Sequence, residues 1–344
     1  MRFLVLSLVL SAFAWLGGQG HAFETEERRW IGPQDGRVLR VISTTDTAIL
    51  APLIESFLVR QPGVAVDYVV ANSSEVMKAV LEGEERFDVA LSSAMDLQTK
   101  LANDGYTLRH QSAATARVPD WGEWRGHVFA FSLEPASFVV NAGVLEGQEI
   151  PRTRRDLIAF LRAAPERFRG RIATYDVRQS GLGYLFATQD ARTSESYWRL
   201  MEVIGGLQPR LSCCSGRMIE QVAAGEVLVA YNVLGSYARA RRDLADKIVV
   251  IDPEDHTHLM MRSAVLLKGA AEPALARAFA DHLINAAWVY PPPPEYPFRP
   301  PAAALAAAPS SHRPIQLGPG LLVYLDGQKR QRFLEEWQSA VRQR

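Results

Sequence analysis

Short groups of small polar residues follow apolar runs at three places in the first part of this chain. The groups are Ser43-Thr44-Thr45-Asp46, Asn72-Ser73-Ser74 and Ser92-Ser93. Side chains of this type cap helix N-termini, and the free backbone N–H groups at such ends attract anions. Each residue taken alone is more typical of a helix cap than of a ligand contact. Their repetition indicates a site that binds a small molecule through hydrogen bonds.

The same arrangement recurs between residues 178 and 237, where Ser180-Gly181 and Ser215-Gly216 open expected helices. Arg178 is a candidate partner for an anion, because its guanidinium fork fits a carboxylate or a phosphate. A surface ion pair is the alternative for this residue. The residues expected to contact the ligand are Thr44, Thr45, Ser73, Ser74, Ser93, Arg178, Ser180, Gly181, Ser215, Asn232 and Tyr237.

The sequence contains no catalytic or dinucleotide-binding signature. Asp46, Glu75 and His127 are candidate acids or bases for an enzyme, but the sequence identifies no partner for any of them. His256-x-His258 could bind a metal, although a solvated turn after a strand is the favoured interpretation. We therefore expect a binding protein without a cofactor. Turnover of a bound ligand would instead indicate an enzyme.

The two cysteines are neighbours, Cys213-Cys214. This spacing is neither a disulfide framework nor a zinc-binding pattern. In an oxidising compartment the pair can form a vicinal disulfide that locks the loop. If the thiols stay free, they could capture a soft metal or an arsenite-like species. The sequence leaves these alternatives open.

The N-terminus has the pattern of a secretory signal. Met1-Arg2 precedes an apolar run over residues 3–16, and Gly20-His21-Ala22 resembles a cleavage site. The run is too short to span a bilayer as a helix. We expect residues 1–22 to be removed and the mature protein to be periplasmic.

The length of 344 residues favours two domains. Lys and Arg total 38 and Asp and Glu total 38, so the formal net charge is zero. This balance argues against a general nucleic-acid binder, which needs a basic surface.

Apolar patterning predicts the elements that position the polar groups. Strands are expected at residues 38–43, 64–70 and 87–91, and helices at 48–60, 74–81 and 95–103. This alternation implies a parallel sheet with helices on its faces, and a second α/β unit follows between about 135 and 255. Ligands bind at the carboxyl ends of strands in such sheets, so the polar groups should meet at one rim. Residues 23–36 are expected to form a loose lead-in.

The ordered series of these segments resembles the periplasmic solute-binding proteins of ABC importers, in the class that includes ferric-iron-binding proteins. The matching stretches are residues 41–46, 67–75, 87–93, 180–181, 224–232 and 263–270, followed by a helix with Ala278-Phe279. The resemblance implies two α/β lobes, each a sheet flanked by helices, joined by a hinge and closed around a small-molecule solute. Lobe 1 is expected at 37–133 plus 256–344, and lobe 2 at 134–255. We expect a monomer.

The resemblance also bears on the solute. Iron-binding members place two adjacent tyrosines just after the position of Asn232, whereas here Ser236 precedes Tyr237. Ferric iron requires several anionic oxygen ligands. A small organic or phosphorylated anion is therefore the favoured solute, and ferric iron is an alternative.

The expected partner is an ABC permease. The tail from about residue 287 looks similar to tails of solute-binding proteins that serve a membrane histidine kinase, so a sensing role is an alternative. Simple packing of the final helix on lobe 1 is the other interpretation of this tail. A ligand-free adaptor that binds only protein is a third possibility for the whole chain.

Overall fold

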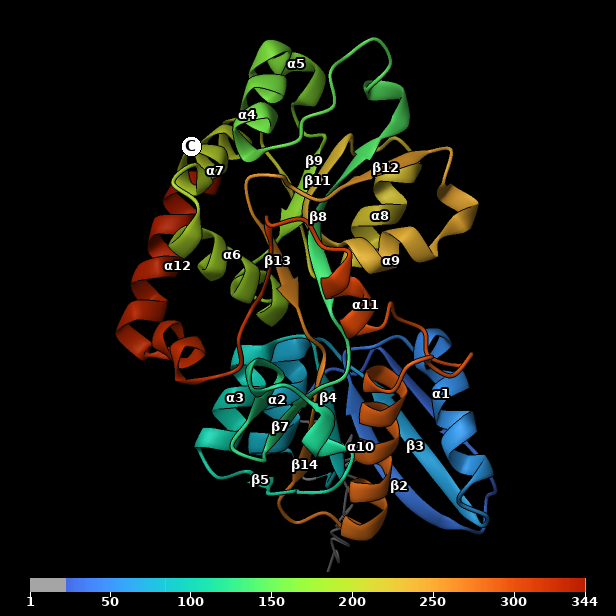
Figure 1. Cartoon of the computed structure of the whole chain (residues 1–344). Helices are drawn as coiled ribbons and strands as arrows, with labels where there is room; N and C mark the ends of the chain where they lie inside the picture. Colours follow the sequence, from blue (N-terminus) through green and yellow to red (C-terminus); the bar gives the residue numbers. More distant parts are fainter. Residues whose placement is uncertain (1–22, 84, 344) are drawn as a thin grey trace, which may run out of the picture.

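A computed structural model describes residues 23–83 and 85–343 (Figure 1). The predicted signal at residues 1–22 lies outside the described residues and stays a prediction. Within the described ranges, no helix combines the length and apolar character needed to cross a membrane.

The first sheet has a parallel centre, as the sequence predicts. Its path is β1-β3-β2-β4-β14-β7-β6, with β5 paired to β14. The strands are β1 (Glu27–Ile31), β2 (Arg37–Ser43), β3 (Val64–Val70), β4 (Val89–Ser92), β5 (Thr107–Leu108), β6 (Glu123–Trp124), β7 (Val128–Ala130) and β14 (Ser263–Leu267). Strand β2 pairs in parallel with both β3 and β4, while β14 joins β4 antiparallel.

Strand β1 corrects the prediction of a loose lead-in over residues 23–36. It pairs antiparallel with β3, from Glu27 opposite Val70 to Ile31 opposite Val66. Its residues are mostly polar and solvent-exposed, so they lack the apolar alternation that marks a strand. The strand forms because it covers the hydrogen-bonding edge of β3, which would otherwise stay unpaired.

Helices cover both faces of this sheet (Figure 1). They are α1 (Thr47–Val59), α2 (Ser73–Glu82), α3 (Met95–Asn103) and α10 (Pro273–Trp288). On one face, Leu50, Phe57 and Phe279 pack with strand residues in a single apolar cluster. We call this sheet and its helices the first half of the molecule.

The second half is built around a sheet with the path β10-β9-β11-β8-β13-β15, with β12 paired to β8. Its strands are β8 (Glu134–Asn141), β9 (Ile172–Tyr175), β10 (Arg210–Ser212), β11 (Val229–Leu234), β12 (Ile248–Ile251), β13 (Thr257–Met260) and β15 (His312–Pro314). Its helices are α4 (Arg154–Ala163), α5 (Pro165–Phe168), α6 (Gly181–Thr193), α7 (Tyr197–Gly206), α8 (Ser215–Ala223) and α9 (Gly235–Ala240).

Two neighbouring segments carry the chain between the halves. The first leads from β7 into β8, and the second leads from β13 into β14. The backbone N–H of Phe131 donates to the carbonyl oxygen of Arg262 over 2.9 Å, so the two crossings lie side by side. Strand β13 also corrects the interpretation of His256-x-His258 as a solvated turn. His258 lies within β13 and is buried.

The last helix, α12 (Gly327–Val341), does not pack on the first half as the sequence analysis allowed. Its Phe333 and Trp337 are buried in the apolar cluster that contains Leu200 and Ile204 of α7. The division of the chain at the predicted lobe boundaries stays a prediction, but this helix belongs by packing to the second half (Figure 1). Before it, the chain forms the short α11 (Pro301–Ala306) and a 3-10 turn over Pro319–Leu325.

Candidate functional site

A cavity of about 290 Å³ lies between the two halves, where helix starts from both of them meet. The first half and the crossings contribute Glu26, Thr44, Asp46, Ala71, Asn72, Ser73, Ser93 and Arg262. The second half contributes Tyr175, Ser180, Leu182, Cys213, Cys214, Ser215, Gly216, Arg217, Glu220, Leu234 and Tyr237. The lining is rich in hydroxyl and charged groups, which suits a small polar solute.

Six of the predicted contact residues line this cavity: Thr44, Ser73, Ser93, Ser180, Ser215 and Tyr237. The strand ends bring them together, as the topology of an open sheet requires. The hydroxyls of Thr44 and Ser93 lie 3.4 Å apart, and the Thr44 oxygen accepts from the Ser93 backbone N–H over 3.1 Å. Their roles in solute binding stay predictions.

Ser74 and Gly181 lie at a contact between the halves, beside the cavity. The Ser74 hydroxyl donates to the carbonyl oxygen of Gln179 over 2.8 Å. A side chain at Gly181 would place its Cβ 2.8 Å from both Ser73 Oγ and Leu97 Cδ1. Glycine is therefore required for α2 and α6 to approach this closely, and the prediction of ligand contact through these two residues is not supported by their position.

Arg262 is the charged residue that sequence analysis missed. Its side chain is almost fully buried, yet it reaches the cavity. Nε donates to Glu134 Oε1 over 2.8 Å, and Nη1 donates to Thr45 Oγ1 over 2.8 Å. Nη2 has no hydrogen-bond partner among the described residues. Thr45, predicted as a ligand contact, instead lies behind Arg262 and orients it.

An aromatic ring stabilises the same guanidinium. The Arg262 Cζ lies 5.1 Å from the centroid of the Tyr237 ring, within the range of a cation–π interaction. Burial raises the pKa of Tyr237 to about 12, although Arg262 opposes this shift. Tyr237 is thus a neutral hydrogen-bonding group at neutral pH. The sequence does contain one signal for Arg262, because this charged residue stands directly before the apolar strand 263–267.

Arg178 does not lie in the cavity, which corrects its prediction as the anion partner. Its Nε donates to Asp176 Oδ1 over 2.7 Å, and the two side chains form an ion pair. Both line a separate groove beside the C-terminal helix, with Gln338 and Arg342. The ion-pair alternative from the sequence analysis is the one observed.

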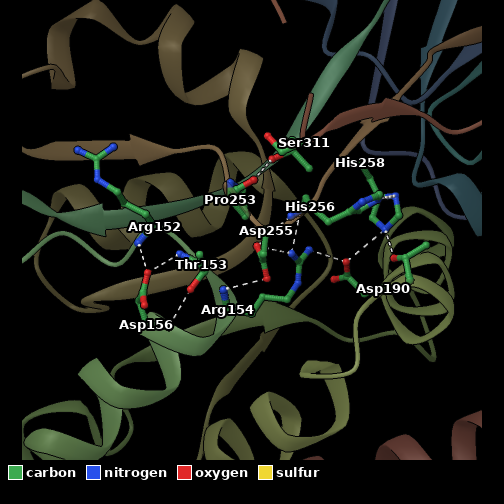
Figure 2. A network of polar contacts seen from close by, with 12 residues as sticks. Arg152, Thr153, Arg154, Asp156, Asp190, Pro253, Asp255, His256, His258 and Ser311 are labelled. Atoms are coloured by element: carbon green, nitrogen blue, oxygen red, sulfur yellow. Dashed lines mark hydrogen bonds and ion pairs between the residues drawn. The ribbon is translucent and has the colours of Figure 1, made fainter. Parts of the chain in front are cut away.

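Asn232 is also outside the cavity lining, because its side chain belongs to a buried polar network. Asn232 has a left-handed backbone (φ 61°) at an irregularity in β11, and its Nδ2 donates to Asp190 Oδ2 over 2.7 Å. Asp190 Oδ1 in turn lies 2.6 Å from Arg154 Nη2 (Figure 2). Burial alone would raise the pKa of Asp190, but Arg154 and His258 hold it well below its usual range. This network fixes β11 just before Tyr237.

The adjacent cysteines form a disulfide, which resolves the alternatives left open by the sequence. Cys213 and Cys214 both line the cavity directly before α8. Cys214 is the N-cap of α8 but provides no side-chain cap for that helix. The disulfide therefore forms part of the cavity wall at an uncapped helix start.

Two carboxylates, Glu26 and Asp46, line the cavity on the side of the first half. Loss of solvation raises the pKa of Glu26, and the nearby Asp46 raises it further. Loss of solvation also raises the pKa of Asp46, against the opposing effect of Arg262. Glu26 lies in the segment predicted as a loose lead-in, so the sequence analysis did not identify it as a site residue.

Within the described residues, no three His, Cys, Asp or Glu side chains gather as metal ligands.

Comparison with protein families matches residues 39–289 to the bacterial extracellular solute-binding proteins. No curated protein matches the chain. Among solved structures, the substrate-binding protein of an ABC transporter from Agrobacterium tumefaciens is 32% identical with a TM-score of 0.83, and the match covers 92% of this chain and 98% of that one.

Two further structures share the fold at lower identity. AfuA from Actinobacillus pleuropneumoniae, a periplasmic binding protein solved with fructose-6-phosphate, is 17% identical with a TM-score of 0.69, covering 90% of this chain and 100% of AfuA. Iron-bound HitA from Pseudomonas aeruginosa is 15% identical with a TM-score of 0.63, covering 88% and 99%. At such identities the similarity concerns the fold alone.

Proposed function

The chain belongs to the bacterial extracellular solute-binding proteins of ABC transporters, and we propose that it captures a small organic or phosphorylated anion in the cavity between its halves. It then presents this solute to the membrane permease of an importer. The family consists of binding proteins and not of enzymes. We further propose that residues 1–22 are a cleaved signal and that the mature protein acts in the periplasm.

The unpartnered Nη2 of Arg262 carries the proposal of an anionic solute. A buried N–H group without an acceptor costs about 1–3 kcal/mol, and more when the group is charged. Because Arg262 lines the cavity, a solute oxygen there would supply the missing acceptor. Glu134 and Thr45 already hold the guanidinium in place, so this donor is oriented before the solute enters.

The helix starts at the cavity support the same conclusion. Helices α2, α6 and α8 all begin beside it, through Ser73, Ser180 and Ser215. Backbone N–H groups and the helix dipole at such ends favour negative charge. The start of α8 has no side-chain cap, so its first N–H groups are available to a bound anion.

Ferric iron as the solute is poorly supported by the chemistry of the lining. Iron favours ionised phenolate oxygens, but burial raises the pKa of Tyr237 to about 12. The guanidinium of Arg262 lies against the same ring and would repel a metal cation. We therefore keep the anion as the proposed solute.

The permease is the partner implied by membership of the family. A sensing role with a histidine kinase was inferred from the C-terminal tail, but α12 packs against α7 of the same chain. No contact in the described residues favours sensing over transport, so sensing stays a prediction.

Isothermal titration of the mature protein with inorganic phosphate, small phosphate esters and small carboxylates tests the proposal. We expect at least one of these anions to bind and to raise the melting temperature, by the equivalent of about 2.7 kcal/mol at a hundredfold excess over its Kd. The double variant Arg262→Met/Glu134→Gln should weaken that binding by about 10- to 150-fold, which corresponds to one charge-assisted hydrogen bond.

The matched control is Arg178→Ala, which removes an arginine outside the cavity. Its affinity for the same anion should equal that of the unmodified protein. Undiminished binding by the folded Arg262→Met/Glu134→Gln variant would overturn the assignment of the anion to Arg262.

A further inference from the structure

The cavity places two unpaired carboxylates near a buried cation. Glu26 and Asp46 line it, and within residues 23–83 and 85–343 neither side chain forms a salt bridge. The backbone holds both residues in position. The Glu26 N–H donates to the Val70 carbonyl over 2.8 Å, and the Asp46 carbonyl accepts from Ile49 at the start of α1.

These carboxylates lie close enough to repel each other. The charge of Asp46 adds to the effect of desolvation in raising the pKa of Glu26, and the pKa of Asp46 is itself raised by desolvation despite the opposing charge of Arg262. Both residues are solvent-exposed, so water screens their charges until a bound solute displaces it. A positive group on that solute would then offset their repulsion.

The charges around the cavity do not balance for a simple anion. Arg262 already forms a buried ion pair with Glu134, so this pair is neutral overall. At the rim, Arg217 and Glu220 have opposite charges. Glu26 and Asp46 therefore leave the cavity with a net negative charge. They would repel a plain anion even while one of its oxygens binds Arg262.

We propose that the solute is a zwitterion, whose anionic carboxylate or phosphoryl group binds Arg262 Nη2 and whose ammonium group binds between Glu26 and Asp46. This inference rests on the proposed function, because it places the anionic end where that proposal does. The cavity of about 290 Å³ limits the solute to a small molecule. Each end of the solute then meets an oppositely charged group, and the site as a whole approaches neutrality.

Two matched series of ligands test the inference by isothermal titration at pH 7. The first compares ethyl phosphate with phosphoethanolamine, and the second compares propionate with β-alanine. Within each pair, the second compound adds an ammonium group to the same anion. We expect the ammonium compound of at least one pair to bind tenfold or more tightly than its partner, since an added charge-assisted contact of about 1.4 kcal/mol gives that factor.

Variants then locate the effect. Glu26→Gln/Asp46→Asn should remove the preference for the ammonium compound and leave binding of the plain anion unchanged or tighter. The control Asp35→Asn/Glu55→Gln makes the same change in net charge at exposed carboxylates outside the cavity. It should keep the preference.

The other outcomes separate this inference from the proposed function. If ethyl phosphate or propionate binds as tightly as its ammonium partner, the anion site stands and the zwitterion is wrong. If 2-hydroxyethyl phosphate binds more tightly than phosphoethanolamine, the carboxylates accept hydroxyl groups and the zwitterion is again wrong. If no compound of either series binds, the zwitterion is wrong, and the anion proposal fails with it when inorganic phosphate and the other anions tested for that proposal do not bind either.

Discussion

The hydroxyl oxygen of Ser73 in α2 accepts a hydrogen bond from the backbone N–H of Leu182 in α6, over 3.1 Å. This bond joins the two halves at the edge of the cavity. With the Ser74 hydroxyl bonded to Gln179, it shows the halves in direct contact. The two bonds therefore bring α2 and the start of α6 together at this edge of the cavity.

Gly181 is the residue that allows this contact. Leucine in its place should hold the halves apart, because even a Cβ would lie 2.8 Å from Ser73 Oγ. Overpacking of this kind costs about 1–3 kcal/mol, so solute affinity should fall by about 5- to 150-fold. Small-angle X-ray scattering with saturating solute should give a larger radius of gyration for Gly181→Leu. The control is Gly320→Leu, because a Cβ added at Gly320 would have no neighbouring heavy atom within 4 Å, and this variant should match the unmodified protein. Equal affinities for both variants would contradict the prediction.

Removing Arg262 alone should destabilise the protein more than replacing both Arg262 and its ion-pair partner Glu134. Arg262→Met alone leaves Glu134 buried without its cation, at a cost of about 3–5 kcal/mol in the free energy of unfolding. Adding Glu134→Gln should recover much of this loss, because the amide can still pair with the Ser132 and Ser236 hydroxyls. Urea denaturation of both variants measures the difference. Equal stabilities would mean that Glu134 is solvated or protonated without Arg262.

The vicinal disulfide should be present in the exported protein. A thiol assay on unfolded protein should detect no free cysteine before reduction and two afterwards. Because Cys213 and Cys214 shape the wall before α8, reduction should weaken solute binding, by a factor of about 5 for one perturbed hydrogen bond near 1 kcal/mol. The variant Cys213→Ser/Cys214→Ser should show the weaker binding with and without reductant. An unchanged affinity on reduction would show that the disulfide only supports the loop.

His256 should make stability fall as the solution becomes mildly acidic. Burial, together with the nearby His258, Arg154 and Arg313, lowers its pKa to about 4, although Asp190 opposes this shift. Its pKa in the unfolded chain is about 6.5, so between pH 6.5 and 4 the unfolded state binds a proton that the folded state does not. Stability from this group is complete above pH 6.5 and is lost progressively toward pH 4, by at most about 3 kcal/mol.

Urea denaturation at pH 7 and pH 5 measures this effect. The variant His256→Gln should lose less stability than the unmodified protein over the same interval. The Nε2 of His256 lies 3.1 Å from Nδ1 of His258, and the glutamine amide is long enough to keep a hydrogen-bonding group near this position (Figure 2). A parallel loss in both proteins would assign the acid sensitivity to other groups.

Local signals predicted most elements of the fold. The helix expected over residues 95–103 has those bounds in α3. It could be predicted because its signals, the apolar spacing and the small polar residues before it, lie within the helix or directly beside it in the sequence. Strand β1 could not be predicted in this way. Its polar sequence forms a strand only because β3, more than thirty residues later, offers an open edge.

The candidate site shows the same division. Thr44, Ser73 and Ser93 follow strands, so the topology alone brings them to one cavity. Arg178 and Asn232 were misplaced because their partners, Asp176 and Asp190, take up their side chains. The sequence gives no measure of which polar group already has a partner, and for the same reason it did not single out Arg262.

The packing of α12 has a practical consequence. Strand β1, near the start of the described chain, is part of the first sheet, whereas α12, at its end, is anchored to α7. Movement of one half against the other would change the distance between the two ends of the mature chain. Fluorescent proteins fused to those ends would then report solute capture by energy transfer, without any label in the cavity itself.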